Sequence, residues 1–205
     1  MYSTLPQRLQ IAVIALLVAF ATVLGALPAR AHTEAPPDLP FETRFVQEVD
    51  ETYFFSSFGD ARPGGRRHEG NDLMAPKMTE VYAFAAGVVI KVAESRRPGR
   101  YLIIDHGGGW ETYYLHLNDD NPGTDDGHAD WSLTFAPGIE EGAEVEAGQL
   151  IAWVGDSGNA EGSGSHTHFE LRYDDRAVDP FPYLKKALEH HDVPYRWIGL
   201  ETQIF

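Results

Sequence analysis

The chain contains 205 residues, of which 43% are hydrophobic and 23% charged, and this composition is typical of a globular protein with a core of ordinary size. The absence of cysteine excludes disulfide bonds, cysteine-ligated metals, iron–sulfur clusters and a thiol nucleophile. A formal net charge of −15 argues against nucleic-acid binding, which requires a basic surface. Any metal site must therefore use the nine histidines and the carboxylates.

The N-terminal segment has the three parts of a secretory signal peptide. Arg8 precedes an uncharged apolar run over residues 11–27, and Pro28 is followed by the small-x-small sequence Ala29-Arg30-Ala31. We therefore expect residues 1–31 to direct secretion to the periplasm, the cell envelope or the medium, with no membrane attachment after cleavage. An uncleaved anchor is the alternative, because such a run is at the short end of what spans a bilayer. Residues 32–50 are Pro-rich and polar, which predicts a lead-in segment.

From about residue 51, short β-rich runs alternate with glycine-containing turns. The runs that predict strands lie in residues 80–94 (two runs broken at Ala86-Gly87), 101–105, 110–117, 149–154 and 166–173. Gly107-Gly108-Gly109 predicts a hairpin turn, and residues 182–191 predict one short helix. The pattern favours an all-β fold, a compact antiparallel sheet or sandwich with an open groove and one short C-terminal helix.

Residues 118–146 carry nine acidic residues and no Lys or Arg. Gly, Asn and Pro in the first half of this segment predict a loop. Clustered Asp and Asn oxygens suit Ca²⁺, but their spacing does not match an EF-hand, so a solvated acidic loop is favoured.

Two histidines, His166 and His168, lie two residues apart in the last predicted strand. Residues with this spacing share a face, so both imidazoles should project together, with Glu170 continuing that face. The residues between them should face the apolar side: Thr167, Phe169 and Leu171. Two histidines on one strand face are typical of a metal site, although two incidental surface histidines are the alternative.

His68 and Asp72 form a second candidate pair, because Gly70 between them favours a tight loop. Together with the His166/His168 pair they offer nitrogen and oxygen donors for three protein ligands. A fourth position left to water is typical of catalytic zinc rather than structural zinc.

The remaining histidines are weaker candidates. His116 lies near the end of the strand over residues 110–117, where alternation groups it with Thr112 and Tyr114. It is either a site residue or a half-buried strand histidine. His106 is expected to serve the hairpin turn. Three more are not assigned to a site: His128, His190 and His191.

Other catalytic families do not match. A cupin needs a glutamate three to four residues beyond the second histidine of the pair, and Glu170 comes too early. The helical His-Glu-x-x-His motif of zincins is absent, and the sequence around Gly162-Ser163-Gly164 lacks the spacing of a serine-hydrolase elbow.

The combined motifs resemble the lysostaphin/LytM-type zinc metallopeptidases, which cut peptidoglycan cross-bridges. The strings that carry the resemblance are HEGND at His68–Asp72, TYYLHL at Thr112–Leu117, the run from Glu140 to Arg172 that includes SHTHFELR, and Asp179-Pro180 with Tyr183-Leu184. The resemblance implies a catalytic domain at residues 51–185, with an acidic insertion at 118–139 and a C-terminal tail at 186–205. An upstream tyrosine that some members carry has no match, since Phe58-Gly59 and Arg62 occupy that region.

The resemblance also implies roles for single residues. His68, Asp72 and His168 would bind one Zn²⁺, while His116 and His166 would act in catalysis without binding the metal. The implied function is a secreted zinc endopeptidase that hydrolyses the peptide cross-links of bacterial peptidoglycan. Two alternatives stay open: a non-catalytic envelope module that binds peptidoglycan or activates an amidase, and an endopeptidase for soluble proteins or Gly-rich peptides.

Overall fold

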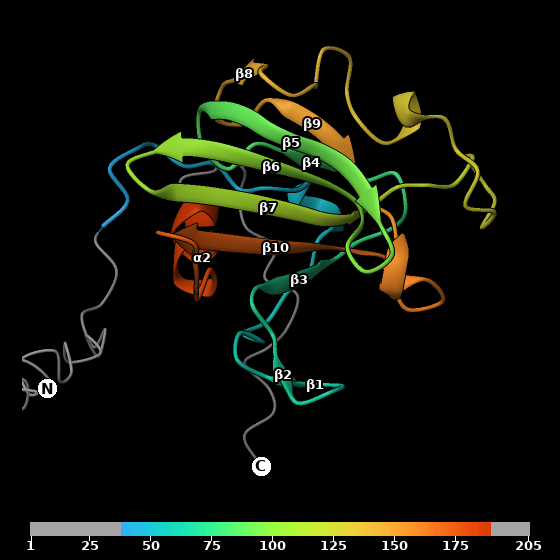
Figure 1. Cartoon of the computed structure of the whole chain (residues 1–205), viewed down its shortest axis with the longest axis horizontal. Coiled ribbons are helices and arrows are strands. Elements are labelled where there is room, and N and C mark those ends of the chain that lie inside the picture. The colour runs from blue at the N-terminus through green and yellow to red at the C-terminus, as the bar shows by residue number, and fades with distance from the viewer. Residues whose placement is uncertain (1–37, 190–205) are drawn as a thin grey trace, which may run out of the picture. The chain divides into compact units, whose positions relative to one another are not determined.

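A computed structural model describes residues 38–189 (Figure 1). The expected signal peptide at residues 1–31, most of the tail and the histidines at 190 and 191 lie outside the described residues. Within 38–189, no helix is long and apolar enough to cross a membrane.

An antiparallel sheet of seven strands dominates the fold, as the short β-rich runs predicted. Six strands follow the order β11–β10–β7–β6–β5–β8, and β3 pairs with β10 beside β11 (Figure 1). The strands of this sheet are β3 (Asn71–Met74), β5 (Gly87–Ser95), β6 (Gly99–Gly107), β7 (Trp110–Leu117), β8 (Glu144–Val145), β10 (His166–Tyr173) and β11 (Arg176–Val178).

Smaller elements flank this sheet. Two pairs of short strands are β1 (Ala61–Arg62) with β2 (Arg66–Arg67), and β4 (Glu80–Tyr82) with β9 (Leu150–Trp153). The predicted C-terminal helix is confirmed as α2 (Phe181–Glu189), and three short 3₁₀ turns lie at Val49–Glu51, Trp131–Leu133 and Gly158–Ala160. The predicted hairpin is also confirmed, because Gly107, Gly108 and Gly109 adopt the positive φ angles that a tight β6–β7 turn requires.

The core lies on one face of the large sheet. Alternate side chains of its central strands, among them Leu102, Tyr114 and Phe169, are fully buried there. They pack with the β4–β9 pair and with Leu184 of α2 in one apolar cluster. The strand period of two turns the intervening residues to the opposite face. That face is the floor of an open groove, lined by side chains such as Tyr113.

Lys77 anchors the acidic segment to the rest of the protein. Its Nζ lies 2.5 Å from carboxylate oxygens of Asp120 and Asp125 and 2.7 Å from Asp156 Oδ1. Asp120 and Asp156 are only 2% and 3% exposed. Burial disfavours the charged amine, but the hydrogen bonds to the three carboxylates raise the pKa of Lys77, which therefore stays charged. The acidic segment, which was expected to be a solvated loop, is thus partly buried. The ammonium group of Lys77 provides the positive charge at the carboxylates for which Ca²⁺ had been considered.

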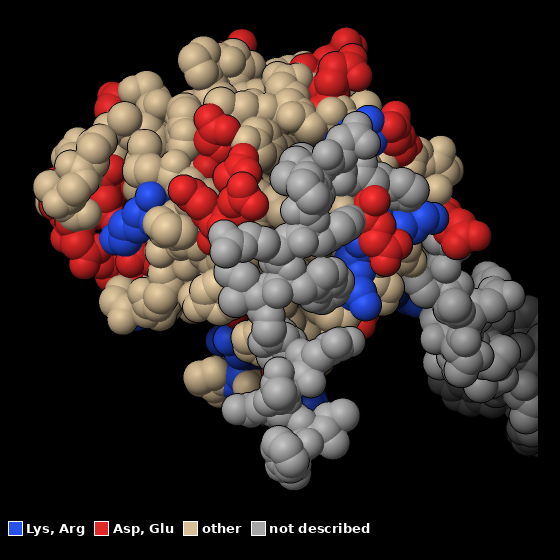
Figure 2. All heavy atoms as spheres, turned by 180° about the vertical axis from the view of Figure 1, so that it is seen from behind, with Lys and Arg blue, Asp and Glu red and all other residues tan. Residues whose placement is uncertain are grey.

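Residues 122–128 of this segment are exposed, whereas Phe135, Ile139 and Val145 are buried in the core. Acidic side chains gather at the left of Figure 2, on the side of the molecule where residues 118–130 lie. Within the described chain, no residue of 118–146 lines the groove over the sheet. The acidic segment therefore forms surface away from the groove.

Replacing Lys77 with Met should lower the free energy of unfolding by about 3 kcal/mol, because Asp120 and Asp156 would stay buried without a counter-charge. Urea denaturation at neutral pH measures this change. The matched control is Lys91→Met, which breaks an exposed pair with Glu141 and should cost less than about 1 kcal/mol. Equal losses in the two variants would refute a buried anchor.

Candidate active site

Strand pairing places His168 opposite Asp72. Residues His166–Phe169 of β10 pair with β3, and the Cα partner of His168 is Asp72. Leu73, the next residue of β3, points into the core and is fully buried, so Asp72 faces the groove. The predicted orientation of β10 is confirmed as well, because Thr167, Phe169 and Leu171 are fully buried on the core side.

His68 reaches this pair through the turn that ends at β3. Gly70 packs directly against β10, where a Cβ would meet the carbonyl oxygen of Phe169 at 2.2 Å. Only glycine allows this approach, which brings the His68 ring to 4.7 Å from the His168 ring. His68 Nδ1 donates a hydrogen bond to the carbonyl of Ser57 at 2.9 Å, which leaves Nε2 free to face the cluster.

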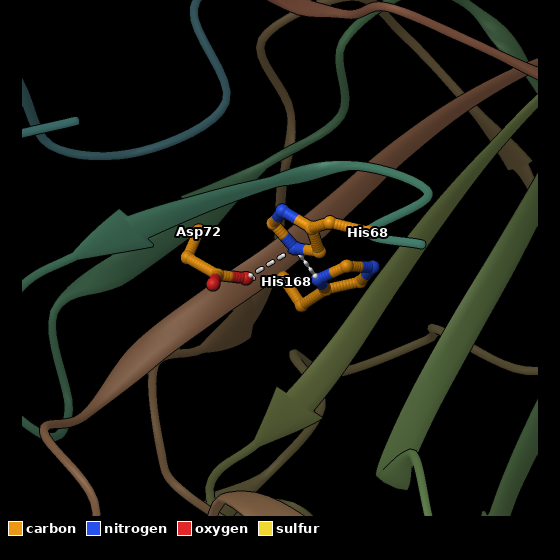
Figure 3. A group of neighbouring side chains, drawn as sticks. All are labelled: His68, Asp72 and His168. Carbon is orange, nitrogen blue, oxygen red and sulfur yellow. Dashed lines mark hydrogen bonds and ion pairs between the residues drawn. The ribbon is translucent and has the colours of Figure 1, made fainter. Parts of the chain in front are cut away.

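Three donor atoms converge at this point (Figure 3). His68 Nε2 lies 2.9 Å from His168 Nδ1 and 3.0 Å from Asp72 Oδ1, and His168 Nδ1 lies 2.8 Å from the same oxygen. Ligands of a tetrahedral zinc ion are roughly 3.3 Å apart, so a small outward shift would admit the ion. Two neutral imidazoles and one carboxylate are also a donor set that zinc favours.

The electrostatics of the cluster favour a positive charge beside Asp72. Burial would raise the pKa of Asp72, but its contacts with the imidazoles of His168 and His68 hold that pKa well below its usual range. Burial likewise disfavours a charged His168 ring, yet the hydrogen bonds to Asp72 and Glu170 raise the pKa of His168. A proton or a metal ion at this point satisfies the ionised carboxylate.

A second layer of side chains orients the ligands. His168 Nε2 donates to Glu170 Oε1 at 3.1 Å, and Arg172 holds the other oxygen of Glu170 at 2.6 Å. Arg62 lies 2.6 Å from Asp72 Oδ2, which leaves Oδ1 to face the two imidazoles. These contacts fix which atom of each ligand points into the cluster.

His116 reaches the groove through an irregularity in β7. Arg100 pairs with Leu117 and Leu102 with Tyr114, so β7 has one extra residue between these pairs. His116 has a φ of +62° there. Its ring lies 5.1 Å from the His166 ring, on the groove side. The expectation that His116 shares a face with Thr112 and Tyr114 is therefore wrong, because the bulge reverses the alternation.

His116 and His166 present free nitrogens to the groove. His116 Nδ1 donates to the carbonyl of Ser157 at 2.9 Å, and His166 Nδ1 donates to that of Gly164 at 2.7 Å. Nε2 of each ring is therefore an acceptor. Burial and the neighbouring His166 and His168 lower the pKa of His116 to about 4, and burial also lowers the pKa of His166. Both rings are neutral at pH 7 and able to take a proton.

The groove that contains these residues has a volume of about 780 Å³. It brings together all five candidate residues of the sequence, His68, Asp72, His116, His166 and His168. His106 instead lies in β6 and bonds Ala86 and Thr112 rather than the residues of the hairpin turn that it was expected to serve. His128 is exposed.

Comparison with known proteins identifies the family. Residues 66–180, more than half of the chain, match Peptidase family M23. The chain belongs to this family. The resemblance stated from the motifs is thereby confirmed, and the candidate metal site His68/Asp72/His168 lies in a metallopeptidase domain.

Individual proteins with similar sequences or structures are peptidases as well. The M23 domain is 34% identical over 112 residues to the peptidoglycan DD-endopeptidase ShyB of Vibrio cholerae, covering 55% of this chain and 22% of ShyB. The structure of a zinc-containing peptidase from Vibrio cholerae has 29% identity and a TM-score of 0.54, over 67% of this chain and 38% of that one. The catalytic domain of lysostaphin from Staphylococcus simulans shares the fold, with 24% identity and a TM-score of 0.52 over 67% of this chain and 95% of that domain.

The residues that sequence reasoning missed are those of the second layer. Glu170 was placed on the correct strand face but without a partner. Arg172 follows it at a spacing of two, so the run His168, Glu170, Arg172 already put a base, an acid and a cation on one face. The backbone carbonyls of Ser57 and Ser157 left no signal, since any residue type supplies a carbonyl.

Replacing Glu170 with Gln should weaken metal affinity by about 10- to 100-fold, because His168 would lose the anionic partner that raises its basicity as a ligand. Competition with a chromogenic zinc chelator measures this affinity. The control is Glu69→Gln, since Glu69 also pairs with Arg172 but does not contact His168. An affinity equal to that of the wild type would exclude an orienting role for Glu170.

Proposed function

We propose that the M23 domain is a zinc-dependent endopeptidase that hydrolyses the peptide cross-links of bacterial peptidoglycan. The observation that carries this proposal is the arrangement of five polar groups in one groove. His68, Asp72 and His168 converge on one point, while the free nitrogens of His116 and His166 face the same groove. Three ligands with separate acid–base groups beside them are the arrangement of a catalytic zinc site rather than a structural one.

The metal ligands proposed are His68 Nε2, Asp72 Oδ1 and His168 Nδ1, which fit a single Zn²⁺. When bound, zinc supplies Lewis acidity, which activates water near neutral pH and polarises a carbonyl group. The protein's part is to hold these ligands in one tautomer and orientation. Ser57, Glu170 and Arg62 do so through the hydrogen bonds described above.

The acid–base steps are assigned to His116 and His166. A neutral imidazole with Nδ1 tied to a carbonyl accepts a proton at Nε2, so either ring can take the proton of the attacking water. The ring that has taken this proton then carries an N–H at Nε2, with which it can hydrogen-bond to the developing oxyanion or protonate the leaving amine. The distance of 5.1 Å between the two ring centres supports this assignment, because rings this close can act on one peptide bond.

Secretion into the cell envelope is part of the proposal. It rests on the sequence pattern of residues 1–31 and on the peptidoglycan DD-endopeptidase activity named for ShyB. The chain spans only about a fifth of the length of ShyB.

Digestion of purified sacculi tests the function. We expect zinc-loaded protein to release peptide fragments detectable by mass spectrometry, a chelator to stop release, and added zinc to restore it. Protein that binds one zinc ion but releases nothing would favour the non-catalytic envelope module. Cleavage of oligoglycine or elastin without cleavage of sacculi would favour the soluble-substrate alternative.

A further inference from the structure

The groove has a charge opposite to that of the whole chain. The chain carries a formal net charge of −15, yet five arginines line the groove against three carboxylates. The arginines are Arg62, Arg66, Arg67, Arg97 and Arg172, and the carboxylates are Glu69, Asp72 and Glu170. The groove is therefore a basic site on an acidic protein.

Two of these arginines form ion pairs with all three carboxylates of the groove. Arg62 pairs with Asp72, and Arg172 pairs with both Glu170 and Glu69. Arg66, Arg67 and Arg97 are exposed, and within residues 38–189 none of them forms an ion pair. Arg66 and Arg67 donate only to backbone carbonyls, those of Pro63 and Gly59.

These three guanidinium groups stand at both ends of the histidine cluster. Arg66 and Arg67 form β2, which lies at the lower end of the coloured ribbon in Figure 1, and they directly precede His68. Arg97 lies in the β5–β6 turn, whose Pro98 carbonyl accepts the backbone N–H of His116. His168 lies between, 4.7 Å from the His68 ring and 6.0 Å from the His116 ring.

We propose that Arg66 and Arg97 are substrate-binding residues that select peptides with free carboxylates on either side of the scissile bond. This inference rests on the proposed endopeptidase function and names the substrate class of the same groove. An exposed guanidinium binds a carboxylate through two parallel hydrogen bonds, which an amide or a glycine linker cannot accept equally well. The acidic surface elsewhere repels such a peptide, so attraction is confined to the groove.

Matched substrates test the selection. Two synthetic cross-linked peptides would differ only in whether their side-chain and terminal carboxylates are free or amidated. We expect the free-carboxylate peptide to have the lower KM, with an advantage that shrinks as salt screens the charges. Arg66→Gln and Arg97→Gln should each raise its KM by about fivefold with kcat unchanged, and should leave the amidated peptide unaffected.

Arg96→Gln is the matched control, since Arg96 is an exposed neighbour of Arg97 that does not line the groove. Equal KM values for the two peptides, or equal effects of Arg96→Gln and Arg97→Gln, would overturn the inference.

Measuring peptide binding tests this inference independently of the proposed function. If neither peptide is cut, calorimetric titration of the zinc-loaded wild type with both peptides still measures selection. Tighter binding of the free-carboxylate peptide that Arg97→Gln removes would support the inference while the endopeptidase function fails. Equal affinity for both peptides would overturn it.

Discussion

Zinc-free, inactive protein is the expected result of replacing His168 with Ala. His168 carries one of the three donor atoms of the proposed metal site, and its loss leaves Asp72 Oδ1 with a single imidazole partner in that cluster. We expect the zinc content to fall from one equivalent to near zero after gel filtration. Endopeptidase activity should fall by at least about 10⁴-fold, because the protein would no longer hold the zinc ion that would activate water and polarise the carbonyl. Metal analysis and the sacculi assay measure the two effects.

The fold should survive this change. His168 projects from β10 toward the groove, so Ala leaves the core-facing neighbours Thr167 and Phe169 in place. Circular dichroism should therefore match that of metal-free wild type. His128→Ala is the control, because His128 is exposed in the acidic segment and should keep both zinc and activity. A His168→Ala protein that retains one zinc equivalent would remove His168 from the ligand set.

The second large effect is expected at His116, where activity and metal binding should separate. His116 is not among the three converging donors, so His116→Asn should retain one zinc equivalent. Loss of a general acid or base should lower kcat by about 10²- to 10⁴-fold. Asn is the appropriate replacement because it tolerates the φ of +62° at this position better than Ala does.

Two comparisons make this prediction specific. His166→Asn should likewise keep the zinc and lose activity, since both rings are proposed to take part in proton transfer. His106→Gln is the control for a histidine of the same sheet that lies outside the groove lining, and it should stay active. A fully active His116→Asn enzyme would exclude His116 from the mechanism.

Much of the fold follows from local patterns. The strands β7 and β10 were predicted because their short runs are rich in β-forming residues and are bounded by glycine-containing turns, and the hairpin because three glycines allow positive φ. The alternation of side chains along a strand identified which face of β10 carries His166 and His168. These features depend only on neighbours in the chain, so a single sequence is enough to predict them.

The division of roles among the histidines did not follow from local pattern. Spacing alone left His166 and His168 equivalent, and only the resemblance to a family distinguished ligand from catalyst. In the structure the two rings differ in position, because β3 pairs with β10 in a register that sets Asp72 opposite His168. A register between strands about 95 residues apart is decided by packing of Leu73 and Phe169 in the core, not by either strand alone.

The position of the negative charge is a second feature that local sequence pattern did not predict. The sequence showed that residues 118–146 carry nine of the 31 acidic residues and no Lys or Arg, but it could not place this segment in the fold. A loop over the groove would have disfavoured anionic substrates. The structure ties part of this segment to Lys77 and lines the groove with arginines instead. Net charge is a sum over residues, whereas substrate attraction depends on where those charges lie.

By itself, then, the sequence determined the β-rich fold, the absence of cysteine chemistry, the five candidate residues and the family they resemble. Tertiary structure alone decided which atoms of those residues converge, through the Gly70 contact, the pairing of β3 with β10 and the bulge that turns His116 into the groove. The physical reason is that residue types and periodicity are local, while donor geometry is set by close packing between segments far apart in the chain.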